Sequence, residues 1–285
     1  MAITYQRIQH IIERQAAAEQ AFLQEFADGD FTLEQPLVKL NPYFICPLTA
    51  MILFKTPIAC EVTITVLGQE PAGDISHTFP SEKEHILPVY GLYGGWINTV
   101  NIRLSTGESQ QIQITTDPLI SDIHPATFIQ TSSQYMGDNM MFLAASMDCK
   151  SAAYDYKGDI RWYTNVFLNF DIKRMANGHI LVGTERLLKM PYYTSGLYEM
   201  ALSGKIFKEY VSNMGGYHHD QFVMPDGHIL MCTSEMYNET VEDILVLLDK
   251  DTGEVLKKWD YKNILPQYPI AGSGSQDAKD WFHNN

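Results

Sequence analysis

A seven-residue motif that returns after 49 residues says more about the fold than any other feature of this sequence. The first copy is Met-Ala-Asn-Gly-His-Ile-Leu at 175–181, and the second is Met-Pro-Asp-Gly-His-Ile-Leu at 224–230. A turn residue followed by glycine and then by an apolar run is typical of a β-hairpin. Its return at a fixed distance indicates that one supersecondary unit is used repeatedly.

Three further glycines repeat at a similar distance. Gly158, Gly204 and Gly253 are 46 and 49 residues apart, and each stands between two apolar runs, as in a hairpin. Two interleaved markers with one spacing of about 48 residues predict the four-stranded blades of a β-propeller. Residues 126–285 leave room for about three blades, whereas closed propellers have roughly four to eight. We therefore expect a partial, truncated propeller with uncovered blade edges.

The stretch before the repeat has a different β pattern. Apolar and polar residues alternate in four short segments, at 51–54, 60–66, 95–104 and 110–115. Alternation with a period of two, interrupted by turn residues, predicts the antiparallel strands of a β-sandwich over residues 29–120. The polar segment that His77 and His85 bracket is expected to be a surface loop.

One amphipathic helix is predicted at the amino terminus, over residues 1–28. Apolar residues recur at steps of three and four from Tyr5 to Phe26, and the polar triplet at 28–30 ends the pattern. The apolar stripe can pack on the chain's own sandwich or on a second subunit. Together with the open blade edges, it leads us to expect a homo-oligomer. The predicted fold class is all-β with one N-terminal helix, a β-sandwich followed by part of a β-propeller.

Composition limits the partners and the compartment. The net charge is −14 and the pI is near 5.0, so neither nucleic acid nor an anionic membrane surface is expected as a partner. The cysteines at 46, 60, 149 and 232 form no C-x-x-C pair and are interpreted as buried thiols. The sequence shows no secretion signal and no apolar run of about 20 residues. As written, the chain is expected to be cytoplasmic, or periplasmic or exported if a signal peptide was removed.

The best candidate for chemistry is the place where the repeat is broken. Tyr-His-His-Asp at 217–220 has no counterpart one period earlier, where Leu-Asn-Phe-Asp stands. His283 follows His219 by 64 residues, and Asn285 comes two residues after His283. Because equivalent positions of successive blades converge on the channel of a propeller, these side chains could meet there. Imidazoles and amides in such a group can bind an oxyanion and exchange protons near neutral pH.

Other interpretations of the histidines stay open. His218 and His219 can instead be hydrogen-bonding residues between blades. Two histidines and an aspartate are also ordinary metal ligands, but neighbouring residues of a strand point to opposite faces, so only one histidine can face the channel. No metal site is therefore predicted. His179 and His228 occupy matching positions of the repeat and are interpreted as scaffold.

The combination of these motifs resembles the bacterial arylsulfate sulfotransferases. The resemblance rests on the Gly-His-Ile-Leu blades, the His-His-Asp stretch and the closing Asp-Trp-Phe-His-Asn-Asn at 280–285, and segments 74–77 and 85–93 resemble the family's amino-terminal sandwich. It spans roughly residues 45–285. It implies a six-bladed propeller and the transfer of a sulfuryl group from a phenolic sulfate ester to an acceptor phenol, without the nucleotide donor PAPS and without a cofactor.

By this resemblance, His219 and His283 are the candidate catalytic residues, and Asn285 binds the substrate with them. His218 is included as a substrate-binding candidate, although strand alternation is expected to turn its ring into the blade. The implied mechanism is ping-pong, through a sulfohistidine. Its nucleophile is expected after Asn285, so this chain is expected to be an inactive amino-terminal half. The rival hypothesis is a non-catalytic propeller that only binds a partner.

Overall fold

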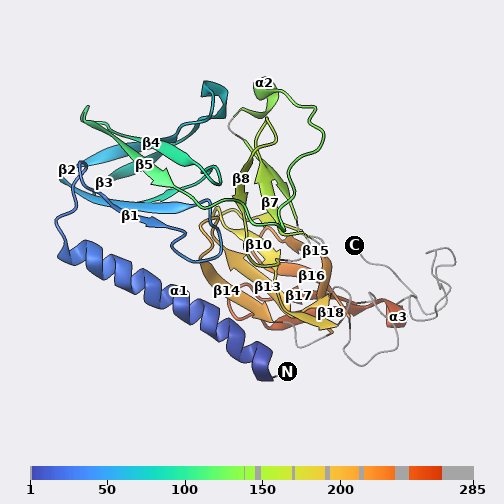
Figure 1. Ribbon diagram of the computed structural model, residues 1–285. Coiled ribbons are helices and arrows are strands. Elements are labelled where there is room, and N and C mark those ends of the chain that lie inside the picture. The colour runs from blue at the N-terminus through green and yellow to red at the C-terminus, as the bar shows by residue number, and fades with distance from the viewer. Residues whose placement is uncertain are drawn as a thin grey trace. The chain divides into compact units, whose positions relative to one another are not determined.

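The structure is a computed structural model in which most of the regular structure is antiparallel β-sheet, with one long helix at the amino terminus (Figure 1), as the predicted fold class requires. It describes residues 2–137, 139–144, 149–168, 171–189, 193–211, 215–234 and 244–264, with the backbone alone for 2–10, 189 and 193. The chain forms two compact units, residues 1–143, 148–166 and 202–205 in the first, and the described parts of 144–147, 167–201 and 206–285 in the second. Within the described ranges, no helix is both long enough and apolar enough to cross a membrane.

Helix α1 (Ala2–Asp28) packs on the first unit through its apolar stripe. Phe22 and Phe26 are buried against Tyr43 and against Leu53 of the neighbouring sheet. The stripe therefore covers the chain's own β domain, which is one of the two possibilities that the sequence leaves open. Gln15, also buried, donates from its amide to the carbonyl oxygen of Tyr43 at 3.0 Å.

The first sheet has five antiparallel strands. They are β1 (Leu37–Leu40), β2 (Ala50–Val66), β3 (Ile75–Val89), β4 (Ile97–Leu104) and β5 (Ser109–Thr115), in the order β1-β2-β4-β5 with β3 also paired to β2. Val62, Ile64 and Val66 alternate into the core, as the period of two predicts. A short helical turn, η1 (Pro71–Gly73), joins β2 to β3.

A second, three-stranded sheet shares that core. It consists of β6 (Met141–Leu143), β7 (Ala152–Tyr154) and β8 (Ile160–Tyr163), after the short helix α2 (Ser133–Met136). Ala152, Ile160 and Tyr163 are buried in the same apolar cluster as the inner residues of β2 and β4. Two sheets that enclose one core are the arrangement of a sandwich. The expected domain boundary between 120 and 126 stays a prediction.

The prediction of a surface loop between His77 and His85 is wrong. Both residues lie in strand β3, and His85 is buried against the ring of Phe54, with the centroids 4.6 Å apart. Its Nε2 lies 3.0 Å from the hydroxyl of Thr56. The polar residues of this segment are the solvent-facing positions of a strand, and their polarity hid the strand pattern.

A buried arginine ties β8 to two loops of the first unit. Arg161 Nε donates to the carbonyl of Gly91 at 2.8 Å, and its Nη1 donates to the hydroxyl of Tyr93 at 3.0 Å. The same Nη1 forms an ion pair with Asp155 at 2.9 Å. A buried guanidinium is tolerated because its charge and most of its donors are satisfied.

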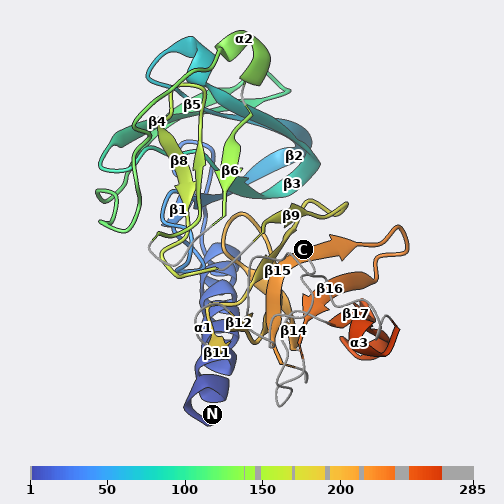
Figure 2. The same ribbon diagram turned by 90° about the vertical axis from the view of Figure 1, so that its right-hand side faces the viewer.

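The second unit contains two antiparallel meanders with the make-up of propeller blades. The first runs β9 (Lys173–Arg174), β10 (Ile180–Gly183), β13 (Gly196–Met200) and β14 (Ile206–Val211). The second runs β15 (Tyr217–Val223), β16 (Ile229–Thr233), β17 (Ile244–Leu248) and β18 (Val255–Asp260), before the short helix α3 (Tyr261–Ile264). Hairpin β11 (Leu187–Lys189) and β12 (Tyr193–Thr194) adds two strands beside β15 (Figure 2).

The repeated glycines are hairpin turns, as predicted. Gly178 and Gly227 have φ of 85° and 89°, and their amides donate to the carbonyls of Met175 at 3.0 Å and Met224 at 2.8 Å. The other marker glycines, at 158, 204 and 253, have φ of 77°, 92° and 74°. Left-handed backbone is accessible to glycine at no steric cost, which is why these positions repeat.

The histidines that follow two of these turns each contact the neighbouring strand region through Nδ1. His179 Nδ1 lies 2.6 Å from Glu199 Oε1, and its ring stacks on Phe207. In the second meander, the backbone amide of Lys250 donates to His228 Nδ1 at 3.2 Å, and Asp249 Oδ2 lies 3.7 Å from the same atom. Both rings are engaged within their own meander, as scaffold residues are.

Candidate functional site

The break in the repeat coincides with a bulge in strand β15. Tyr217 pairs with Thr233 and Gln221 pairs with Met231 on β16, so three residues of β15 stand opposite the single residue Cys232. Bulges leave residues outside the ladder and redirect their side chains, and they are common beside active sites. The three residues of the bulge are His218, His219 and Asp220, so the local fold presents the predicted histidines differently from a regular strand.

His219 has a left-handed backbone conformation, with φ of 58°. Within the described ranges, the other non-glycine residues with positive φ are Asn41 and Phe44, both in the first unit. This conformation costs a residue with a Cβ about 1–2 kcal/mol. Such strain persists only where the surrounding structure holds the residue in place, and it is concentrated at functional sites.

The two histidine rings contact each other at the bulge. Their centroids are 5.2 Å apart and the ring planes are at 81°, an edge-to-face arrangement. The His218 side chain is fully buried, whereas His219 is partly exposed to solvent. Strand alternation, on which the expected separation of the two rings depends, does not apply across the bulge. Which ring meets a ligand therefore stays a prediction, and exposure favours His219.

The side chains of Tyr217 and Gln221, which the sequence did not indicate as site residues, contact each other and the backbone of the bulge. The Tyr217 hydroxyl donates to the side-chain carbonyl of Gln221, and it also lies 3.3 Å from the carbonyl oxygen of His219. The Gln221 amide donates to the carbonyls of Asp171 at 3.0 Å and Leu181 at 3.1 Å. Leu181 belongs to β10, so Gln221 joins the two meanders of the second unit beside the histidines.

A small group of charges lies at the rim of the bulge. Lys173 of β9 forms ion pairs with Asp171 and with Asp220, the latter at 3.1 Å. The hydrogen bond to Asp171 is the main cause that raises the pKa of Lys173, so its charge persists at neutral pH. Two carboxylates that share a lysine repel a neighbouring anion less than free carboxylates do.

Burial and nearby carboxylates also fix the protonation state of Tyr217. Desolvation in the core of the second unit raises its pKa well above the ordinary 10, and the charges of Asp220 and Asp171 raise it further. The hydroxyl therefore stays protonated and remains a hydrogen-bond donor to the bulge throughout the neutral range.

The remaining site candidates differ in what the structure says about them. His283 and Asn285 lie outside the described residues, so their expected meeting with His219 stays a prediction. Within the described part of the chain, no three His, Cys, Asp or Glu side chains are grouped as a metal site would require. The bulge contains two histidines and an aspartate but does not arrange them in that way.

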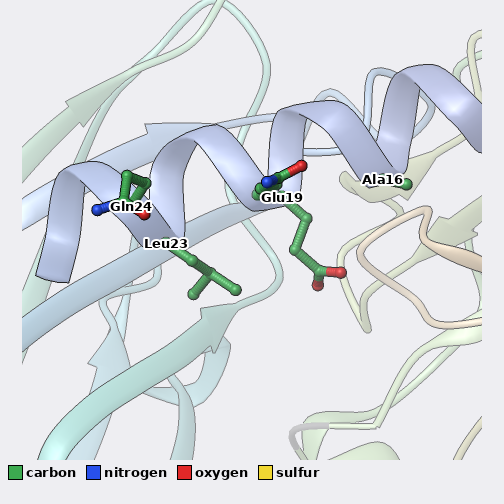
Figure 3. A pocket seen from close by; sticks show the side chains of 5 residues that line it. Ala16, Glu19, Leu23 and Gln24 are labelled. Atoms are coloured by element: carbon green, nitrogen blue, oxygen red, sulfur yellow. The ribbon is translucent and has the colours of Figure 1, made fainter.

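Two hollows on the first unit involve none of the predicted site residues. One, of about 410 Å³, lies along α1 and is lined by Ala16, Glu19, Gln20, Leu23 and Gln24 (Figure 3). The carboxylate of Glu19 in it already accepts from the Tyr43 hydroxyl at 2.7 Å and pairs with Lys205. The other, of about 360 Å³, is lined by residues of the paired strands β2 and β3, with His77 and Phe79 on its wall.

The contact between Gln221 and Tyr217 was not predicted from the sequence. Tyr217 and Gln221 are four residues apart on a strand, and in a regular strand such residues lie about 13 Å apart and do not touch. Only the bulge brings them into contact. The available signal was that both residues depart from the previous repeat, where Leu168 and Ile172 occupy the positions 49 residues earlier.

Comparison with known proteins gives consistent results for both parts of the chain. The family model described as arylsulfotransferase (ASST) matches residues 126–285, and the arylsulfotransferase Ig-like domain matches residues 37–118. No curated protein matches the chain significantly. Among solved structures, a protein of unknown function from Bacteroides caccae is similar at 12% sequence identity with a TM-score of 0.29, over 70% of this chain and 73% of that chain. That likeness is too remote to support an argument.

Proposed function

The chain belongs to the arylsulfotransferase family, and we propose that the bulge of β15 binds the sulfuryl group of phenolic sulfate esters, with His219 as a hydrogen-bond donor to the sulfuryl oxygens. The observation that carries this proposal is the backbone of His219. A partly exposed imidazole stands in a strained conformation at a point where the repeat is broken, inside the segment that the family model matches. On either side of it, Tyr217 and Gln221 pair with β16.

The chemistry of sulfuryl transfer suits such a donor. We expect sulfuryl transfer, like phosphoryl transfer, to pass through a loose transition state with charge spread over the peripheral oxygens, so donors fixed around the group stabilise it. In the proposed ping-pong route, the S–O bond to the leaving phenolate breaks as a histidine nitrogen bonds to sulfur. The acceptor phenol then attacks sulfur, loses its proton and releases the histidine. His283 and Asn285 are proposed as further donors, with His283 as the second catalytic histidine. The route needs neither PAPS nor a cofactor.

Calorimetric binding of 4-nitrophenyl sulfate and of inorganic sulfate tests the proposal. His219→Asn keeps a residue that tolerates left-handed backbone but removes the imidazole, and it should weaken both affinities about tenfold or more, as expected for a lost charge-assisted hydrogen bond. His228→Asn is the matched control, because it changes the scaffold histidine of the same meander. Equal affinities for His219→Asn and wild type would overturn the proposed role.

Release of 4-nitrophenol distinguishes an enzyme from a binding module when it is measured on a form of the protein that carries the expected nucleophile. The enzyme hypothesis predicts that release by this form rises with the concentration of an acceptor phenol. A propeller that only binds its partner predicts bound ester without release. The binding measurement applies to both hypotheses, since holding the sulfuryl group precedes its transfer.

We also propose that the chain self-associates through a blade edge. Strand β18 pairs with β17 and, among the described strands, with no other. Val255 and Leu256 on it are about half exposed, and an open edge with apolar side chains is a site for strand pairing. Light scattering should give a mass above that of one chain, and Leu256→Lys should lower it. A monomer at high concentration would contradict this proposal.

A further inference from the structure

We propose that Tyr217 and Gln221 are positioning residues that hold His219 in its left-handed conformation, with the ring directed to the sulfuryl group. This inference rests on the proposed function of His219. It adds to that site two side chains that contact the backbone and side chains of the bulge and do not contact the ligand. Neither residue has a counterpart of similar chemistry in the preceding repeat.

Gln221 is fully engaged by groups on both sides of the bulge. Its side chain is 2% exposed. The amide nitrogen donates both protons, one to the carbonyl of Asp171 and one to that of Leu181, and the amide oxygen accepts from Tyr217. A glutamine side chain offers two donor protons, and both are used here. Its orientation is therefore fixed by three partners, of which Leu181 belongs to the neighbouring meander and Asp171 lies just before it.

Tyr217 connects the Gln221 side chain to the backbone of His219. Its ring is fully buried in the core of the second unit, next to the side chains of β16 and β17. The hydroxyl donates to Gln221 and lies 3.3 Å from the His219 carbonyl oxygen. Because this carbonyl belongs to the residue with the left-handed φ of 58°, the hydroxyl contacts the backbone of the strained residue itself.

The repeat gives an independent reason to connect these residues with function. One period earlier, the positions of Tyr217, His219 and Gln221 hold Leu168, Phe170 and Ile172. The blade without the histidine thus has apolar residues at both bracing positions. The brace and the histidine depart from the repeat together, as expected if one exists to position the other.

The test compares Tyr217→Phe with wild type by two measurements. The change removes one oxygen atom and keeps the ring that fills the core, so folding should be retained. Nitrogen-15 NMR of histidine-labelled protein should show changed ring signals for His219, assigned by their loss in His219→Asn, and unchanged ring signals for His179 and His228. The dissociation constant for inorganic sulfate should rise about fivefold, the loss expected when one buried hydrogen bond is removed.

Tyr198→Phe is the matched control. Tyr198 is also fully buried in the second unit, and its hydroxyl donates to Glu185 at 2.9 Å. This variant should lose similar stability while leaving the His219 signals and sulfate affinity unchanged. Gln221→Met, which keeps the length of the side chain and removes its polar atoms, should reproduce and exceed the effect of Tyr217→Phe.

The outcomes separate this inference from the function on which it rests. If Tyr217→Phe leaves the His219 ring signals as in wild type and lowers stability only as far as Tyr198→Phe does, the pair is structural and the inference is overturned. If the His219 signals shift, the positioning role holds even where wild type fails to bind sulfate. In that second case the proposed function alone is refuted.

Discussion

Replacing His219 with glycine should give a more stable protein than replacing it with alanine, which is the reverse of the order at an ordinary strand position. Both variants remove the imidazole and its contact with His218. They differ only in the Cβ, so their difference reports the backbone conformation of residue 219. The comparison does not depend on any ligand.

The size of the difference follows from the φ of 58°. Left-handed backbone costs alanine about 1–2 kcal/mol through its Cβ and costs glycine nothing. Glycine in turn loses about 0.5–1 kcal/mol relative to alanine because its unfolded chain is more flexible. The free energy of unfolding should therefore favour His219→Gly over His219→Ala by about 1 kcal/mol.

Phe222 supplies the control on the same strand. It is exposed and pairs regularly with Leu230 of β16, so Phe222→Gly should be less stable than Phe222→Ala by about 0.5–1 kcal/mol. Amide hydrogen exchange at Met231 and Val246, which are buried at the centre of the second unit, measures the free energy of opening in each variant. If His219→Ala is as stable as His219→Gly or more stable, residue 219 is not strained and the bulge gives no reason to place a ligand there.

Three further predictions concern the rest of the fold. Burial raises the pKa of Tyr217 and of Tyr198 above the ordinary 10, so their contribution to stability is complete below pH 10. Above that pH the unfolded state releases phenolic protons that the folded state retains. The free energy of unfolding in urea should therefore fall by about 1.4 kcal/mol per pH unit for each of the two tyrosines, and it should fall less steeply in Tyr217→Phe. A free energy of unfolding that stays constant up to pH 11 would contradict the burial of these residues. Arg161→Met leaves a buried carboxylate without its cation and should lower the free energy of unfolding by about 3 kcal/mol or more; a loss under 1 kcal/mol in thermal unfolding would refute the buried pair. Gly204→Ala should lower the melting temperature more than Gly227→Ala does, because a Cβ at 204 meets atoms of Ile45 and Cys46 at 3.1–3.3 Å, whereas one at 227 meets the flexible side chain of Lys250. Equal melting temperatures for the two variants would contradict this.

The repeat predicted the turns of the second unit correctly because glycine encodes them directly. A hairpin that needs positive φ at one position restricts that position to glycine, so Gly178 and Gly227 could be recognised in the sequence and located as turns. The N-terminal helix was equally predictable from its apolar period. Its packing partner was not, because the same stripe suits any apolar surface.

Strand length and His85 were harder to predict from sequence alone. β2 runs from Ala50 to Val66 through Pro57, which the sequence suggests as a break, because the ladder absorbs the proline at an irregularity between Lys55 and Cys60. β3 has a long solvent-facing side, so its polar residues resemble those of a loop. Local composition does not distinguish an exposed strand face from a connection.

The bulge could not be predicted from the sequence for a different reason. The motif at 217–220 was recognisable as a departure from the repeat, but alternation along a regular strand was the wrong geometry for it. Three residues opposite one leave the side chains of the bulge outside the alternation of the strand, so a regular pattern cannot say which face each side chain occupies. The contact between Tyr217 and Gln221 exists only because of the bulge.

The most direct test of the central claim is a titration of the histidine-labelled wild-type protein with 4-nitrophenyl sulfate, followed by nitrogen-15 NMR. If His219 donates to the sulfuryl group, its ring signals should shift progressively and saturate at the dissociation constant found by calorimetry, while those of His179 and His228 stay in place. Saturable binding that leaves the His219 signals unmoved would show that the ester is held elsewhere and would contradict the account.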